Sequence, residues 1–167
     1  MSDTLNFRFH DIDAGWAKCC AAASDQSHEF LFGYCTPAFE DIAAFGIMAA
    51  LGRDYRIVFD DESTTTIFDF SLHWVPPPDV SRFRFETWSL GQYTHEVLAM
   101  MRAGGDWRRN GKRVLSMNIG GDVVALAILR ELERVEEELG RAEFKKKWMQ
   151  PWPARSVSIL RYALESL

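Results

Sequence analysis

The sequence predicts an α+β fold: one antiparallel sheet of about six strands, with helices packed on one of its faces. Three observations lead to this prediction. Residues 54–88 alternate between apolar and polar side chains over three consecutive segments, as the strands of a central meander do. Residues 36–51 and 121–150 instead carry apolar side chains at helical spacing. Because 167 residues suit one domain, we expect residues 1–167 to form a single α+β domain.

Three strands are expected before the first helix. Residues 5–10 alternate between apolar and polar side chains, which predicts a half-buried strand. The small side chains of residues 15–22 favour a second strand beneath a closely packed helix. Residues 28–35 follow a turn and are expected to form the third strand.

The first helix is expected to begin at Thr36 and Pro37, because Thr is a favourable N-cap and Pro a favourable first helical residue. It should run to about Leu51. Glu40 and Asp41 are its only charged residues, and both lie near its start. Because almost no polar face remains beyond them, we expect this helix to be buried against the sheet.

The meander follows as strands over residues 55–60, 64–74 and 82–87. The acidic turn at residues 60–63 joins the first two strands, and the three prolines at 76–78 end the second. Each strand has one apolar and one polar face, which is typical of a sheet that packs on the core with one side only.

Residues 92–103 fit two patterns. Val97, Met100 and Met101 suit a helix, whereas Val97, Ala99 and Met101 suit a strand; we favour the strand, paired in a hairpin with residues 112–119.

The long helix over residues 121–150 should bury a stripe of apolar residues, and Gly140 is a point where it can break or bend. The stripe consists of Ala125, Ile128, Leu132, Val135 and Leu139. A short terminal helix is expected over residues 156–167.

Charge and composition limit the classes of function. The net charge of −5 argues against general affinity for nucleic acid, which needs cations to displace phosphate counterions. The N-terminus lacks a basic start followed by an apolar stretch, and the longest apolar run, residues 42–51, is about half of what a spanning helix needs. Three cysteines cannot all pair, which favours a reducing compartment. We therefore expect a cytoplasmic protein with no membrane partner.

The motif search predicts neither a metal site nor a cofactor site. The pairs His28-Glu29 and His95-Glu96 lack the second His, four residues after the first, that a zinc protease helix requires. Residues 10–13 could offer ligands to a hard cation, but the closing Glu of a calcium loop is absent, so a solvated turn is favoured. Residues 104–113 carry four cations and Trp107, which could contact RNA or an acidic partner. A solvated hairpin tip is the favoured interpretation there.

Several short segments occur in an order that resembles a known group of proteins. A strand ending at residues 34–35 leads into an apolar helix carrying Asp41, and Tyr-Arg-Ile-Val-Phe-Asp-Asp-Glu follows at residues 55–62. Trp148 then precedes Pro-Trp-Pro at residues 151–153. This order resembles small bacterial α+β immunity-type proteins that are encoded beside secreted or contact-dependent toxins. Members often have Pro-Gly after the acidic turn, where this chain has Ser-Thr.

The resemblance implies a cytosolic inhibitor that binds a cognate toxin domain and does no chemistry, so no catalytic residue is carried over. We predict that it occludes a basic active site with an acidic surface, because electrostatic complementarity speeds association and enforces specificity. The candidate partner-binding residues are Asp60, Asp61, Glu62, Asp69, Glu136, Glu137 and Glu138.

Two further classes remain open. The alternative is a small-molecule-binding protein or an enzyme with a pocket against the sheet, lined by His73, Trp74, Tyr93 and His95. The third class is a homo-oligomeric structural protein that pairs through the apolar stripe of the long helix.

Overall fold

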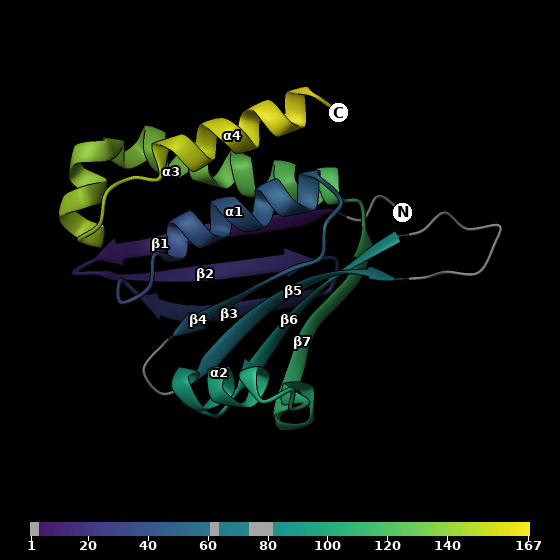
Figure 1. The fold of residues 1–167 in the computed structure, drawn as a ribbon. Coiled ribbons are helices and arrows are strands. Elements are labelled where there is room, and N and C mark those ends of the chain that lie inside the picture. The colour runs from purple at the N-terminus through teal and green to yellow at the C-terminus, as the bar shows by residue number, and fades with distance from the viewer. Residues whose placement is uncertain (1–3, 61–63, 74–81) are drawn as a thin grey trace.

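The computed structural model describes residues 4–60, 64–73 and 82–167, and its strands form two antiparallel sheets. The first sheet is a meander of β1 (Leu5–Asp13), β2 (Trp16–Ala23) and β3 (Gln26–Gly33). The second sheet has the order β4 (Tyr55–Asp60), β5 (Thr65–His73), β6 (Arg82–Leu90) and β7 (Gly111–Ile119). The predicted meander is therefore confirmed, but the strands are divided between two sheets rather than joined in one (Figure 1).

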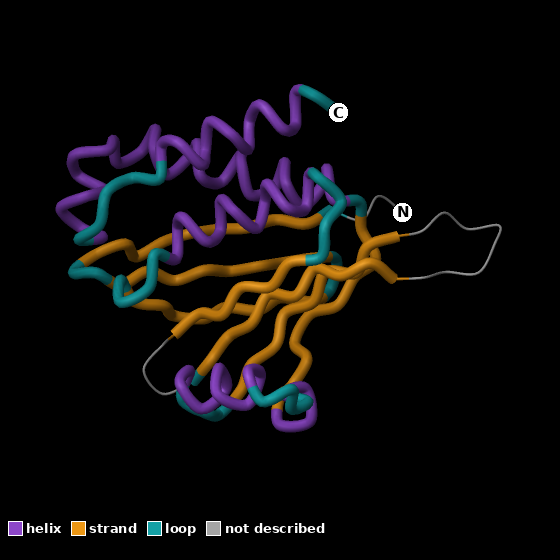
Figure 2. The backbone as a smooth tube through the Cα atoms, in the orientation of Figure 1, coloured by secondary structure: helices purple, strands orange, loops and turns teal. Residues whose placement is uncertain are grey.

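The helices lie on two sides of the strands. One layer holds α1 (Ala38–Ala50), α3 (Gly121–Trp148) and α4 (Ala154–Glu165). The opposite side holds α2 (Thr94–Arg102) and the short 3₁₀ helix η1 (Trp107–Asn110), which cover one end of the second sheet (Figure 2). The α+β class is thus confirmed, and α1 and α3 lie on one side of the strands as expected. The helix on the opposite side, α2, falls in residues that were favoured as a strand. Among the described residues, no helix has the length and apolar character needed to cross a membrane.

The main core lies between the inner faces of both sheets and the helices α1 and α3. Aromatic side chains fill it, and Phe68 of β5 is at its centre. The ring centroid of Phe68 lies 4.9 Å from that of Phe59 and 5.4 Å from those of Phe30 and Phe85. Because Phe30 belongs to the first sheet and the other two to the second, these contacts join the sheets into one apolar interior.

The apolar stripe of α3 belongs to this core. Ala125, Ile128, Leu132 and Val135 are all buried, as the helical spacing predicts. Their burial leaves the stripe unavailable to a second copy of the chain, so the predicted oligomer through this surface is not supported. Gly140 has φ 69° and interrupts the helical conformation, which confirms the predicted break.

Residues 94–102 form the helix α2 rather than the favoured strand. Val97 is fully buried, and Met100 and Met101 pack beside it on Ile67. These three residues share one side of a helix, whereas Ala99, which a strand would have turned to the same side, is exposed. The helix forms because the outer face of the second sheet carries an apolar patch, and only a helix turns Val97, Met100 and Met101 together onto that patch.

Replacing Gly121 by alanine is expected to lower the free energy of unfolding by about 3 kcal/mol. Gly121 begins α3 against the end of α1, and a Cβ there would lie 2.0 Å from the carbonyl oxygen of Ala49. The matched control is Gly91→Ala, because within the described part of the chain no atom beyond the adjoining residues lies within 4 Å of a Cβ at that position. Urea unfolding followed by circular dichroism should separate the two variants; equal midpoints would contradict the close approach of α1 and α3.

Candidate functional site

The predicted acidic residues that the structure describes do not gather on one surface. Asp60 is half-buried at the end of β4, and Asp61 and Glu62 lie outside the described residues. Asp69 is only 2% exposed, so its assignment to an exposed acidic surface is corrected. Residues 136–138 lie on α3, in the helical layer away from the end of β4 (Figure 1).

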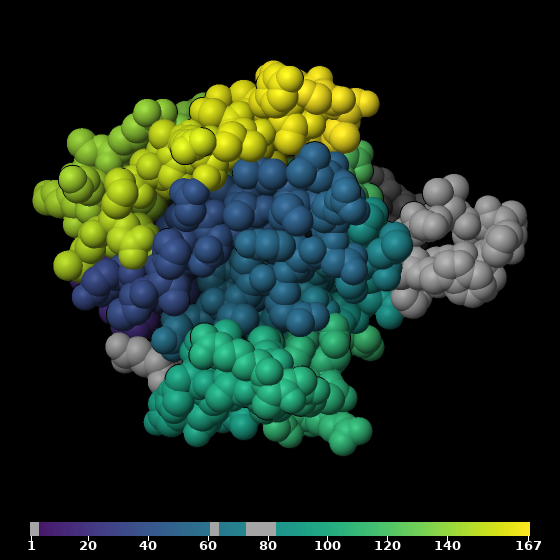
Figure 3. Space-filling view, viewed as in Figure 1, coloured from purple at the N-terminus to yellow at the C-terminus, as the bar shows by residue number. Residues whose placement is uncertain are grey.

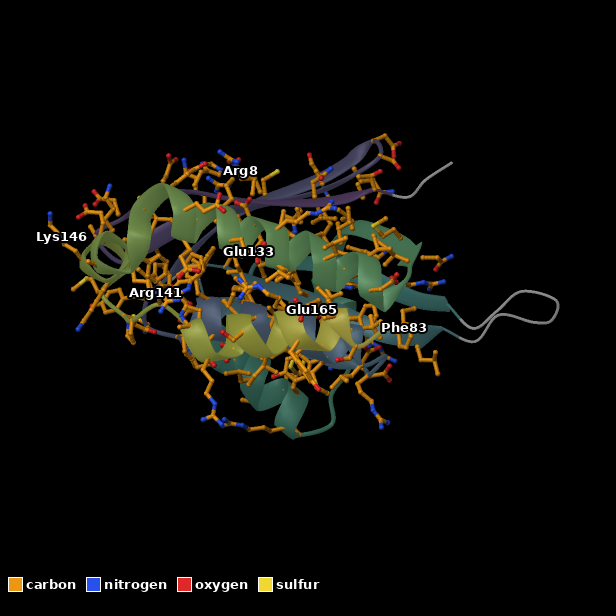
Figure 4. The ribbon with its side chains drawn as sticks, turned by 90° about the horizontal axis from the view of Figure 1, so that it is seen from above. Arg8, Phe83, Glu133, Arg141, Lys146 and Glu165 are labelled. Atoms are coloured by element: carbon orange, nitrogen blue, oxygen red, sulfur yellow. The ribbon has the colours of Figure 1, made fainter. Side chains whose placement is uncertain are left out.

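The acidic run of α3 is largely paired with arginines of the same chain. Glu138 contacts Arg134 and lies 3.9 Å from Arg8, and the arginine beside it holds the pKa of Glu138 below its ordinary value. Glu136 contacts Arg141, while Glu137 is exposed. Figure 4 shows Arg8 on the side of α3 away from α4, and Glu133 on the side that faces α4. The negative charges of α3 therefore point in several directions and are partly neutralised.

Asp69 instead anchors two arginines at the outer face of the second sheet. Arg56 of the neighbouring strand β4 donates from Nε to Asp69 Oδ1 at 2.9 Å, and its Nη2 lies 2.8 Å from the same oxygen. Arg108 of η1 donates from Nη2 to Oδ2. Both carboxylate oxygens are thus occupied by guanidinium groups. These two arginines also flank the buried indole of Trp107, at 5.0 and 4.6 Å from its centroid.

Glu86 is a second buried carboxylate on the same face, and it is 6% exposed. Arg113 of β7 donates from Nη1 to Glu86 Oε1 at 3.1 Å, and Ser116 donates its hydroxyl to the same oxygen at 3.2 Å. The indole N–H of Trp88 donates to Oε2 at 3.1 Å. Sequence reasoning did not single out Glu86.

The two carboxylates are direct neighbours, because Asp69 of β5 pairs with Glu86 of β6 in the strand register. Like charges opposite each other destabilise a sheet unless cations compensate them. Here three guanidinium groups from three separate elements supply that compensation. We call this group the Arg–Trp cluster; it consists of Arg56, Asp69, Glu86, Trp88, Trp107, Arg108 and Arg113.

Local structure explains how distant residues reach this cluster. Strand alternation turns Asp69 and Glu86 to the outer face while their neighbours Phe68 and Phe85 enter the core. The helix α2, in the teal to green part of Figure 3, packs on the apolar part of the same face. The segment after it, η1, brings Arg108 into contact with Asp69. Trp107 is 4% exposed, so it does not supply the stacking surface for RNA that was considered for residues 104–113.

The predicted pocket of the alternative function is not assembled. Tyr93 and His95 stack with centroids 5.8 Å apart, near the Thr65 end of β5, where Thr65 bonds to the carbonyl oxygen of Gln92. His73 ends the same strand, roughly 27 Å away at the usual rise per residue. The fourth predicted residue, at position 74, lies outside the described residues. Tyr93 and His95 therefore lie at the opposite end of β5 from His73.

A cleft of about 370 Å³ does lie elsewhere, between β1 and α3. Two side chains of α3 hold the outer edge of β1 beside it: Glu131 accepts the N–H of Phe9, and Arg134 donates to the carbonyl oxygen of Phe9 at 2.6 Å. These bonds satisfy the backbone N–H and carbonyl of Phe9, which an edge strand would otherwise expose. The bond to the Phe9 N–H explains why Glu131 is buried, and both bonds hold α3 against the first sheet.

Comparisons of the chain with protein-family models, with curated proteins and with solved structures found no match. Within the described ranges, no three His, Cys, Asp or Glu side chains gather closely enough to hold a metal ion. The Arg–Trp cluster is therefore assessed from its own geometry: a rigid surface group with two buried acids and three partly exposed cations.

Proposed function

We propose that this chain is a protein-binding inhibitor, specifically a cytosolic immunity protein that neutralises a cognate bacterial toxin by occluding it. The Arg–Trp cluster is the observation that carries the proposal. Arginine and tryptophan dominate the binding energy of many protein interfaces, most of all where they are held rigidly before the partner arrives.

The burial of two adjacent carboxylates supports a binding role over a purely structural one. A buried ion pair contributes little net stability compared with apolar residues of similar size, so stability alone gives no reason for it. The carboxylates instead hold the arginines in position: Asp69 contacts Arg56 and Arg108, and Glu86 contacts Arg113. Placement of exposed guanidinium groups is useful where a partner has to be recognised.

The test begins with capture of the partner by the tagged chain in its native host. The captured protein, or its C-terminal domain, is then expressed alone in a second bacterial host, where it is expected to arrest growth. Co-expression of the wild-type chain should restore growth. The double variant Arg108→Ala/Arg113→Ala should bind the purified partner roughly 100-fold more weakly and fail to restore growth.

Arg109→Ala is the matched control, because its side chain is 83% exposed on the same 3₁₀ helix and pairs only with Asp106 at 3.3 Å among the described residues. It should restore growth as the wild type does. Circular dichroism of each variant checks that the fold is retained. A captured protein that is harmless when expressed alone would overturn the inhibitor proposal, and full rescue by the double variant would remove the cluster from the interface.

A further inference from the structure

The Arg–Trp cluster is a positive site on a negative protein. Its three guanidinium groups exceed its two carboxylates by one charge, whereas the whole chain carries −5. Residues 94–113 add to this local excess, since outside the cluster they hold three further Lys or Arg residues and two acidic residues. The sign of the charge at this site is thus opposite to that of the acidic surface predicted from the sequence.

Two of the arginines have donors to spare. A guanidinium group carries five N–H donors in a planar fork. Among the described residues, Arg108 uses Nη2 on Asp69 and Arg113 uses Nη1 on Glu86. Their side chains are 41% and 52% exposed. Each therefore presents N–H groups to solvent while its internal bond holds the group in place.

The two forks stand beside one indole. Arg108 lies over Trp88 with 6.0 Å between its Cζ and the ring centroid, and Trp88 is opposite Arg113 in the strand register. Trp88 is itself tied through its N–H to Glu86. A ligand that bridged Arg108 and Arg113 would thus cross a fixed, half-buried aromatic ring.

We propose that this site receives side-chain carboxylates from an acidic segment of the protein partner, one on Arg108 and one on Arg113, with the segment lying across Trp88. The inference rests on the proposed function, because it names the chemistry of the partner that the inhibitor binds. Arginine forks match carboxylates in bidentate geometry, which is why this pairing gives both strength and orientation. Asp69 and Glu86 act as positioning residues.

The experiment uses the chain alone and a defined probe, an acetylated tetraglutamate peptide amide. Addition of this peptide should shift the NMR signal of the Trp88 indole N–H with a dissociation constant on the order of 1 mM at low salt. Binding should be at least tenfold weaker in Arg108→Ala and in Arg113→Ala, and unchanged in Arg109→Ala. A tetraglutamine peptide should leave the signal in place.

Glu86→Gln tests the positioning role. This variant removes one negative charge from the cluster, so attraction by net charge alone would tighten binding of the peptide. If Glu86 instead holds Arg113 in position, the Glu86→Gln variant should bind the peptide several-fold more weakly, and this is the result we expect. Tighter binding by Glu86→Gln, or a shift of Trp88 that is larger with inorganic phosphate than with the peptide, would overturn the inference.

The inference and the proposed function can fail separately. An unshifted Trp88 signal together with growth rescue by the wild-type chain would refute acidic-segment recognition alone. A shifted Trp88 signal together with a harmless captured protein would refute the toxin-inhibitor role and leave carboxylate recognition supported.

Discussion

Replacement of Asp69 by alanine is expected to lower the free energy of unfolding by about 3 kcal/mol at neutral pH. The change leaves Arg56 and Arg108 beside the buried ring of Trp107 without the carboxylate that both contact. Removal of one partner from a buried ion pair costs about 3–5 kcal/mol. The lower end applies because both arginines are more than one third exposed and can regain water. Urea unfolding followed by circular dichroism measures the loss.

Two variants make this result specific. Ser71→Ala changes a residue on the same face of β5 and should alter stability by no more than about 0.5 kcal/mol. The triple variant Arg56→Met/Asp69→Leu/Arg108→Met removes Asp69 together with the two arginines that contact it. Its stability should return close to that of the wild type, since apolar replacement of a buried charged group is often neutral. This triple variant should nevertheless no longer bind the protein partner. An Asp69→Ala variant as stable as the wild type would mean that the arginines need no counter-charge.

Much of the fold could be predicted because the signals are local. The alternation over residues 55–60 and the apolar spacing of residues 125–139 each reflect which side of one element faces the core, and both predictions are confirmed. The division into two sheets could not be predicted in this way. It depends on which strands pair, and β3 makes no ladder with β4, although a single sheet was expected. The helix α1 separates these two strands in the chain.

The site was harder to predict than the fold for the same reason. Asp69 was recognised as a polar residue on an outward face, but its two arginines come from β4 and from η1, thirteen and thirty-nine residues away. Only the strand register brings Asp69 beside Glu86. A charged residue that alternates with core residues in a central strand predicts a nearby residue of opposite charge, because a charge on the outer face of a sheet must be compensated where other residues bury it. That signal gives a reason to expect partners, but it does not identify them.

His28 presents the opposite case, a titratable side chain held neutral in the interior. It lies on β3, is 6% exposed, and its Nδ1 is 2.8 Å from the Thr87 hydroxyl of β6, so the pair links the two sheets. Its ring also packs against Phe30, with centroids 5.4 Å apart. Burial lowers the pKa of His28 from 6.5 to about 4, because the charged ring would lose its hydration.

The pH dependence of stability follows from that pKa. Unfolded His28 binds a proton near pH 6.5, whereas folded His28 binds it only near pH 4, so the unfolded state takes up more protons between these values. The stability is therefore complete above about pH 6.5 and falls as the pH drops, by up to about 3 kcal/mol at pH 4. Urea unfolding at pH 7, 5.5 and 4 should show this loss in the wild type and in His95→Gln, whose histidine is exposed. In His28→Gln the loss should shrink by that amount, because glutamine keeps a hydrogen bond to Thr87 but takes up no proton. If the free energy of unfolding falls with pH equally in His28→Gln and in the wild type, His28 is not held neutral in the folded protein.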